Sequence, residues 1–230
     1  FKPYFTLQHI WDGERFSMKN SVYLAIGNGG GRWTETKGKP ISSFMKDGLV
    51  DWEAVVNANM MEDRPSLMAS SDPFSSRPAQ TGISLPEGVA AKNILSDYMA
   101  GHTQTGAIVS MEYKPTGHWI IGAGAHYQYY STWECERITD LLGADYWYED
   151  YGNKSLAGEA GRNPYKKVGD FIRTDNGKVT HHGTLYATAA YQSERLSANL
   201  GVSAFGSVNR RWDKYNYVDD IWSKTAKGLG

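Results

Sequence analysis

Hydrophobic and polar residues alternate along several stretches of the chain. In residues 118–130, HWIIGAGAHYQYY, one set of alternate positions carries Trp119, Ile121, Tyr127 and Tyr129 with alanines between them. The other set is mostly glycine, imidazole and amide. Because successive side chains of a β-strand point to opposite faces, this pattern predicts a strand with one apolar and one polar face. The apolar face is small in its middle and aromatic at both ends.

The same alternation recurs elsewhere in the chain. It is found at residues 16–26, 105–114, 184–192 and 196–208, and residues 1–10 also resemble part of a strand. These runs are long for strands of a globular protein and match the roughly 9–11 residues of a tilted membrane strand. We therefore expect an all-β fold of about six antiparallel strands in three hairpins.

Short and long connections between the runs alternate. The short ones are WDGE at 11–14, PTGH at 115–118 and SER at 193–195, and the long ones are 27–104, 131–183 and 209–230. Asp-Gly and Pro-Thr-Gly favour hairpin turns. Connections without structure beyond about 15 residues are uncommon in compact domains. An outer-membrane barrel, in contrast, has short turns on its periplasmic side and long loops outside.

Two features of the long connections can be interpreted locally. Residues 50–64 predict a short helix on the outer surface, because Asp51 is a plausible N-cap, apolar residues follow at helical spacing, and Pro65 ends the run. Residues 27–33, GNGGGRW, lack the Lys-Ser/Thr pair of a phosphate-binding loop. We interpret them as a flexible exit from a strand into a long loop.

The composition excludes several other classes of protein. The 230 residues carry a formal net charge of -1, so charge gives no argument for a nucleic-acid partner. The single cysteine, Cys135, excludes an internal disulfide framework and a cysteine-based zinc site. Acidic, histidine and serine residues show no catalytic spacing, so we expect neither an enzyme nor a cofactor. No stretch approaches the roughly 20 apolar residues of a membrane-spanning helix.

Several pieces of the chain, in order, resemble a known family. They are KPYFTLQHIWD (2–12), AIGNGGG (25–31), the hairpin at 102–132, ITDLLG (138–143), KVGDFIRTDNGKV (167–179) and the hairpin at 184–218. Together they resemble the barrel portion of TonB-dependent outer-membrane receptors of the Bacteroidetes type. The resemblance implies a 22-stranded barrel with an N-terminal plug that binds a scarce nutrient and imports it with TonB-derived energy.

The resemblance also implies partners and leaves the ligand open. The partners are TonB, acting through the plug segment, the lipid of the bacterial outer membrane, and a small-molecule or glycan ligand such as a siderophore, haem, cobalamin or sugar chain. A surface lipoprotein partner is left undecided. Six strands cannot close a transmembrane barrel, since at least 8 are usual. We therefore expect residues 1–230 to be a partial barrel, without the plug domain and the remaining strands.

Two other classes share part of this pattern. A passive porin or structural outer-membrane protein has the same strand features, and only the family-like segments argue against it. A soluble, secreted β-rich domain that binds carbohydrate also uses Trp and Tyr, but it has no need of such uneven connections. The classes differ in whether Tyr113, Trp119, Tyr129 and Tyr191 face outward around an apolar belt or meet in a dry core.

The candidate binding residues lie in two places. DYWYEDYGN (145–153) is the best candidate for contact with a ligand, because aromatic rings and carboxylates provide stacking and hydrogen bonding through Tyr146, Trp147, Tyr148 and Asp150. The alternative is that the tyrosines pack the loop onto itself. On the polar strand faces, we expect His126, Gln128, Tyr130 and Asn199 to face the lumen, where they would line a passage or contact the plug.

A histidine-based metal site is not expected. Adjacent His181 and His182 point to opposite faces of a strand, and His118 belongs to a turn at the other end of the barrel.

Overall fold

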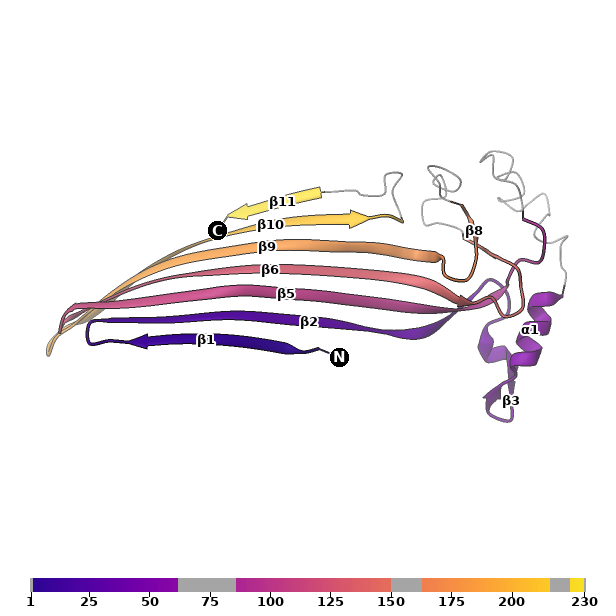
Figure 1. Cartoon of the computed structure of the whole chain (residues 1–230), viewed down its shortest axis with the longest axis horizontal. Coiled ribbons are helices and arrows are strands. Elements are labelled where there is room, and N and C mark those ends of the chain that lie inside the picture. The colour runs from indigo at the N-terminus through magenta and orange to yellow at the C-terminus, as the bar shows by residue number, and fades with distance from the viewer. Residues whose placement is uncertain (1, 62–85, 150–162, 216–223, 230) are drawn as a thin grey trace.

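A single antiparallel sheet accounts for most of the protein. The computed structural model describes residues 2–61, 86–149, 163–215 and 224–229. Each strand of the main sheet pairs with the next along the chain, so the sheet is a meander with β1 and β11 at its edges (Figure 1). Its strands are β1 (Tyr4–Asp12), β2 (Phe16–Thr36), β5 (Asn93–Thr116), β6 (Trp119–Asp140), β9 (Phe171–Gln192), β10 (Ser197–Asp213) and β11 (Lys224–Leu229).

The six predicted strand runs are confirmed, but the strands are much longer than expected. From β2 to β10 they have 17 to 24 residues, and an additional strand, β11, lies within the predicted connection 209–230. The interpretation of residues 27–33 as a loop is wrong. They continue β2 and pair with β5 in unbroken register from Gly27 opposite His102 to Trp33 opposite Ser96.

The pairing explains why a glycine-rich segment stays in the sheet. A Cβ atom added to Gly27 would lie against the imidazole of His102, and one added to Gly30 would overlap the backbone of Tyr98. The missing side chains therefore let the two strands and the His102 ring approach closely. Flexibility was the expected role of these glycines, whereas close approach is their role in the fold.

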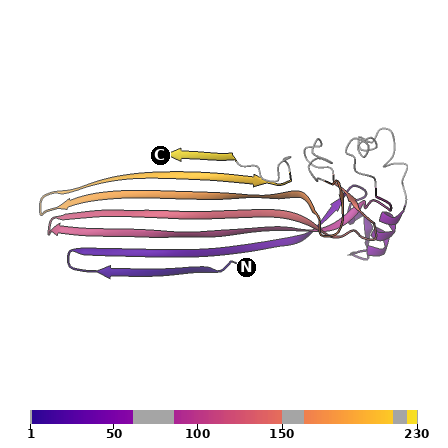
Figure 2. The same ribbon diagram turned by 45° about the horizontal axis from the view of Figure 1, so that its top comes forward.

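All the short turns lie at one end of the sheet and the long connections at the other (Figures 1 and 2). Besides strand extensions, the connections contain small elements: η1 (Ile41–Phe44), β3 (Met45–Lys46), β4 (Leu49–Val50), α1 (Trp52–Met60), β7 (Trp147–Tyr148) and β8 (Tyr165–Lys166). The predicted helix is confirmed, because Asp51 caps α1 by accepting a hydrogen bond from the backbone N–H of Ala54 at 3.0 Å. Pro65 lies outside the described residues. Among these, no helix is both long and apolar enough to cross a membrane.

The apolar positions of the separate strands fall on one face of the sheet. The register places Met18, Met111, Ala123, Ala187 and Val202 in one row across β2, β5, β6, β9 and β10. Directly paired residues share a face, and the alternation within each strand then assigns every other residue. We call this face the apolar face and the opposite one the polar face. The described residues leave the apolar face open: Leu7, Leu185 and Leu200 are 75%, 65% and 70% exposed.

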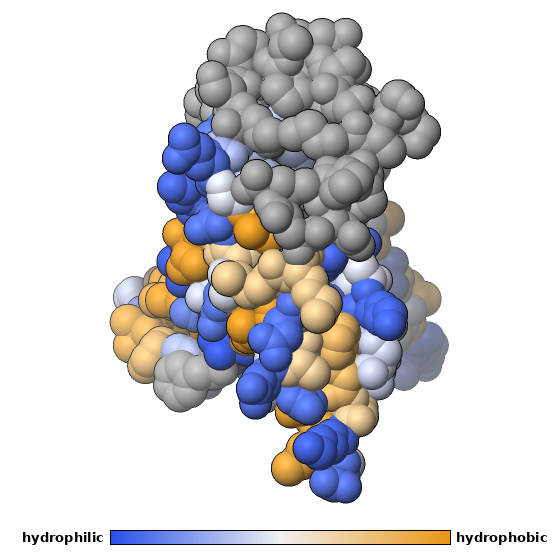
Figure 3. All heavy atoms as spheres, turned by 90° about the vertical axis from the view of Figure 1, so that its right-hand side faces the viewer, coloured by the Kyte–Doolittle hydropathy of each residue, from blue (hydrophilic) through white to orange (hydrophobic). Residues whose placement is uncertain are grey.

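The buried core of the described residues lies at the end with the long connections. Ile94, Ile138 and Ile172, from the ends of three strands, pack with Ala91, Leu141 and Trp147. Figure 3 views this end, where hydrophilic and hydrophobic residues are interspersed between the connections. Among the described residues, the long strands therefore form a single layer, and a conventional core exists only where the connections fold back over the strand ends.

A buried amide joins helix α1 to this core. The Oδ1 atom of Asn59 accepts hydrogen bonds from the backbone N–H groups of Lys92 and Asn93 at 3.1 and 2.9 Å. Its Nδ2 atom lies 2.7 Å from the carbonyl oxygen of Asn93 and 3.1 and 3.2 Å from those of Leu141 and Leu142. One side chain thus fastens the β2–β5 connection to the start of β5 and the end of β6.

Candidate functional site

A row of rings crosses the middle of the polar face. The ring centroids of Tyr4 and Tyr23 are 6.4 Å apart, those of Tyr23 and His126 6.2 Å, and those of His126 and His182 6.2 Å. Phe205 continues the row at 6.0 Å from His182. The row therefore runs from β1 to β10 across strands that are distant in sequence.

One glycine makes this row continuous. Strand β5 lies between β2 and β6, and a Cβ atom at its Gly106 would overlap the ring of Tyr23. Without that side chain, Tyr23 reaches over β5, and its Oη atom lies 3.0 Å from Nε2 of His126. The small residue of one strand therefore creates the position that the aromatic residue of the next strand fills.

The structure places the four predicted lumen residues on one face but does not bring them together. His126, Gln128 and Tyr130 follow one another at alternate positions of β6, and Tyr130 lies 5.9 Å from His102 between ring centroids. Asn199 lies on the same face of β10, opposite Ala190, toward the short turns. Whether this face lines a lumen stays a prediction.

The polar face has two hollows between the row of rings and the end with the long connections. A hollow of about 800 Å³ is lined by His102, Tyr130, Glu134, Lys178 and Arg211, among others. A second hollow of about 580 Å³ lies nearer the long connections, and its lining includes Trp33, Tyr98, Glu134, Glu136 and Arg173. We call them the lower and the upper hollow. Volumes of this size accommodate small-molecule ligands.

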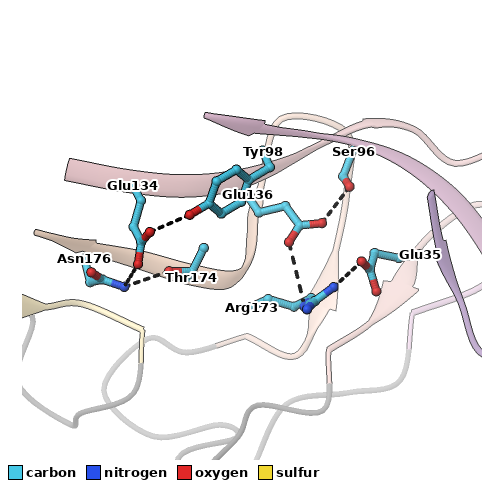
Figure 4. A network of polar contacts seen from close by, with 8 residues as sticks. All are labelled: Glu35, Ser96, Tyr98, Glu134, Glu136, Arg173, Thr174 and Asn176. Carbon is cyan, nitrogen blue, oxygen red and sulfur yellow. Dashed lines mark hydrogen bonds and ion pairs between the residues drawn. The ribbon is translucent and has the colours of Figure 1, made fainter. Parts of the chain in front are cut away.

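Two polar networks border the upper hollow (Figure 4). In the first, Tyr98 donates a hydrogen bond to Glu134, which also accepts one from Nδ2 of Asn176 at 2.9 Å. In the second, buried Glu136 accepts a hydrogen bond from Ser96 at 2.6 Å, and Arg173 pairs with both Glu136 and Glu35. The site therefore holds acceptor-rich carboxylates close to one guanidinium group and two exposed aromatic rings.

A bulge positions Arg173. The register between β6 and β9 shifts between Cys135, opposite Asp175, and Glu136, opposite Ile172. Arg173 lies in the extra segment with a φ of +59°, a left-handed conformation that is uncommon outside glycine. Bulges redirect side chains, and this one directs the guanidinium group toward β6 and β2. Sequence reasoning missed Arg173, since nothing in the local pattern marks the bulge.

The positions of Glu134 and Glu136 on the polar face can be inferred from the sequence. They continue the alternation of His126, Gln128 and Tyr130 beyond the end of the predicted strand. Burial is the main cause that raises the pKa of the Glu136 carboxyl above its ordinary value, against the lowering effects of the Ser96 hydrogen bond and of Arg173.

Three of the four predicted ligand contacts, Tyr146, Trp147 and Tyr148, pack against other residues in the structure. Trp147 belongs to the buried core, and Tyr146 and Tyr148 each pack against Tyr165, with ring centroids 5.5 and 5.6 Å apart. The ammonium of Lys37 lies 5.0 Å from the Trp147 ring centroid. Asp150 lies outside the described residues. The predicted contact of these residues with a ligand stays a prediction.

The histidines do not assemble into one site. His181 Nδ1 lies 2.8 Å from the Tyr127 hydroxyl oxygen on the apolar face, and His182 Nε2 lies 3.1 Å from Thr184 Oγ1 on the polar face, so the prediction of opposite faces is confirmed. Within the described ranges, no group of three or more His, Cys, Asp or Glu residues is arranged to hold a metal ion.

Comparison with protein-family models and with curated proteins finds no match for this chain, so the chemistry of its two faces carries the functional argument.

Proposed function

We propose that this chain is part of the β-barrel of a TonB-dependent outer-membrane receptor, which binds a scarce nutrient and imports it. The observation that carries the proposal is the contrast between the two faces of one sheet. Large apolar side chains cover one face without a second layer of described residues over them. Apolar patches of this extent are rare on proteins surrounded by water, and lipid is a solvent that suits them.

Aromatic residues lie at two levels of the apolar face. Near the short turns, Trp119 packs against Tyr191 with ring centroids 5.0 Å apart, and Tyr113 is 45% exposed. Ten residues further along β6, Tyr129 packs against His181 at 5.3 Å. That separation is about 33 Å along a strand, or about 25 Å in height at the usual barrel tilt, which is the height of the apolar band of outer-membrane barrels.

On β5, β6 and β9 the residues between these levels are apolar and mostly small, whereas β2 and β1 carry Asn20 and His9 at the same height, 3.2 Å apart and hydrogen-bonded to each other. Ala123, Ala125, Ala187 and Val109 lie between the levels, next to exposed Ile121 and Leu185. Tyr and Trp at both boundaries with apolar residues between them are typical of a membrane-facing surface. The rings do not meet in a shared core of described residues, as a soluble sandwich would require. This favours the membrane proposal over a secreted carbohydrate-binding domain.

Two of the segments that resemble the receptor family, 138–143 and 167–179, contact each other. In 138–143, the N–H of Ile138 donates to the carbonyl of Asp170 at 3.0 Å, and the N–H of Gly169 donates back to the carbonyl of Ile138 at 2.9 Å. The second segment, 167–179, also supplies Arg173 and Thr174 to the lining of the upper hollow. The resemblance of these two segments to the receptor family supports a receptor over a passive porin, and the second segment lies beside the upper hollow.

A pair of arginine substitutions tests the membrane part of the proposal. Val202 lies near the middle of the apolar band and is 64% exposed, whereas its neighbour Ser203 lies on the polar face. In a bilayer, Val202→Arg should lower the free energy of unfolding by about 2–4 kcal/mol, and Ser203→Arg by less than about 1 kcal/mol. Equal, small effects of both substitutions in lipid vesicles would contradict a lipid-facing apolar face, since an exposed valine in water tolerates arginine.

Uptake experiments separate a receptor from a porin. Cells that make the protein would be supplied with a labelled siderophore, haem, cobalamin or oligosaccharide, with and without a functional TonB. A receptor accumulates its ligand only with TonB, whereas a porin equilibrates small solutes in both strains. Uptake that persists without TonB would therefore refute the import mechanism and leave the membrane assignment intact.

A further inference from the structure

The lining of the lower hollow is positively charged, whereas the whole chain is close to neutral. Its lining includes the cationic side chains of Lys2, Lys178 and Arg211 and one carboxylate, that of Glu134. With His102 neutral, the lining carries a net charge of +2, although the formal net charge of the chain is -1. The positive charge is therefore a property of this place on the sheet.

Two of the cations are held side by side. Lys178 of β9 and Arg211 of β10 are directly paired in the register and point to the same face. Directly opposed residues have Cβ atoms about 5 Å apart, and like charges in such pairs destabilise a sheet. On its other side, Lys178 faces Thr132 of β6. Neither residue directly opposite Lys178 is therefore a carboxylate.

The nearby carboxylates are already engaged. Glu134 accepts hydrogen bonds from Tyr98 at one carboxylate oxygen and from Asn176 at the other, so both oxygens already have a donor (Figure 4). Asp213 is buried, accepts from the backbone N–H of Tyr215 at 3.0 Å and lies 3.3 Å from one Arg211 nitrogen. Arg211 remains 53% exposed, so part of its guanidinium group is available to a ligand.

The hollow has room for more than an ion. Gly29 of β2 has open space around it there, and the ring of His102, which lies over Gly27, forms an adjacent wall with that of Tyr130. The volume of about 800 Å³ lies within the range of small-molecule sites. Cations at one side and flat rings at another suit a ligand that combines an anionic group with a planar or apolar part.

From these contacts we infer that the lower hollow binds a small anionic ligand through Lys178 and Arg211, with a carboxylate or phosphate group as the recognised chemistry. Its role in import rests on the proposed function, and binding itself is a property of the protein in isolation. The inference narrows the ligand class, because neutral sugars and cationic compounds lack the recognised group.

Calorimetric titration of the protein in detergent tests the inference, with citrate and inorganic phosphate as probes and glucose as the neutral control. At least one anion should bind, glucose should not, and raising NaCl from about 50 to about 500 mM should weaken binding, because the charges are exposed. Lys178→Gln should weaken binding by about fivefold, and the double variant with Arg211→Gln should weaken it further, by an amount that need not be the product of the single effects because the two residues are neighbours. Whichever anion binds more tightly identifies the carboxylate or the phosphate as the preferred group.

The matched control is Lys19→Gln, which removes the same charge from the polar face outside the hollow. Because Arg211 also pairs with Asp213, the single Lys178 variant keeps the test independent of any loss of folding. Absence of binding by both anions, or equal affinity of the Lys178 and Lys19 variants, would overturn the inference. Tighter binding of tetra-aspartate than of citrate would also overturn it, in favour of an acidic protein segment.

The two proposals fail separately. If Val202→Arg destabilises the protein in bilayers but neither anion binds, only the proposed anion site is refuted. If an anion binds but Val202→Arg does not destabilise the protein in bilayers, the proposal of a membrane receptor is refuted and that of an anion site stands.

Discussion

Asn59 joins helix α1 of the β2–β5 connection to the strand ends, and its loss should loosen this attachment. It is fully buried and hydrogen-bonds two backbone N–H groups and three carbonyl groups. Asn59→Ala leaves the N–H groups of Lys92 and Asn93 without this acceptor, and an unsatisfied buried group costs about 1–3 kcal/mol. With two N–H groups left unsatisfied, we expect the free energy that holds α1 against the strand ends to fall by about 3 kcal/mol.

Hydrogen exchange measures this loss locally. A change of about 3 kcal/mol corresponds to an increase of about 100-fold in the exchange rates of the Lys92 and Asn93 amides. Amides in the middle of β5 should keep their protection, since they belong to the sheet. The control is Asn57→Ala, because Asn57 lies exposed on the same helix. Unchanged exchange at Lys92 and Asn93 in Asn59→Ala would refute the role of this amide.

Two further substitutions test the polar face. Gly124→Ala places a Cβ atom within the ring of Tyr186, which donates a hydrogen bond to Ser110 at 2.9 Å, so it should lower the unfolding midpoint in denaturant and cost about 1–3 kcal/mol. Gly183→Ala, with open space around it, should cost nothing measurable, and equal midpoints would contradict the overlap. Glu136 lies beyond the proposed membrane span, and its raised pKa means that the folded state holds the proton more tightly than the unfolded chain. Stability should therefore fall as pH rises from about 4.5 through the folded pKa, and Glu136→Gln should flatten that dependence; an unchanged slope would speak against it.

The strand pattern of this protein is visible in its sequence, and the site is only partly visible. Alternation predicted which residues of each run share a face, because it is a local property of extended backbone. It also predicted that His126 and Tyr130 lie on the polar face. The capped helix at Asp51 followed from equally local signals.

The ends of the strands and the partners across them were decided by the tertiary structure. Residues 27–33 resemble a flexible loop in isolation, yet they pair with β5 because the neighbouring strand supplies the His102 ring that lies against Gly27. Similarly, Trp147 seemed suited to a ligand, but it is buried against segments distant in the chain.

Local alternation determined that this chain forms strands with one apolar and one polar face, since every residue carries its own direction relative to the backbone. The register between the strands determined which side chains become neighbours. Only the pairing of β9 with β10 places Lys178 beside Arg211, and only the bulge opposite Cys135 turns Arg173 toward Glu35. Such contacts join residues tens of positions apart, and they depend on which strands pair and in what alignment, which the alternation within a single strand does not specify.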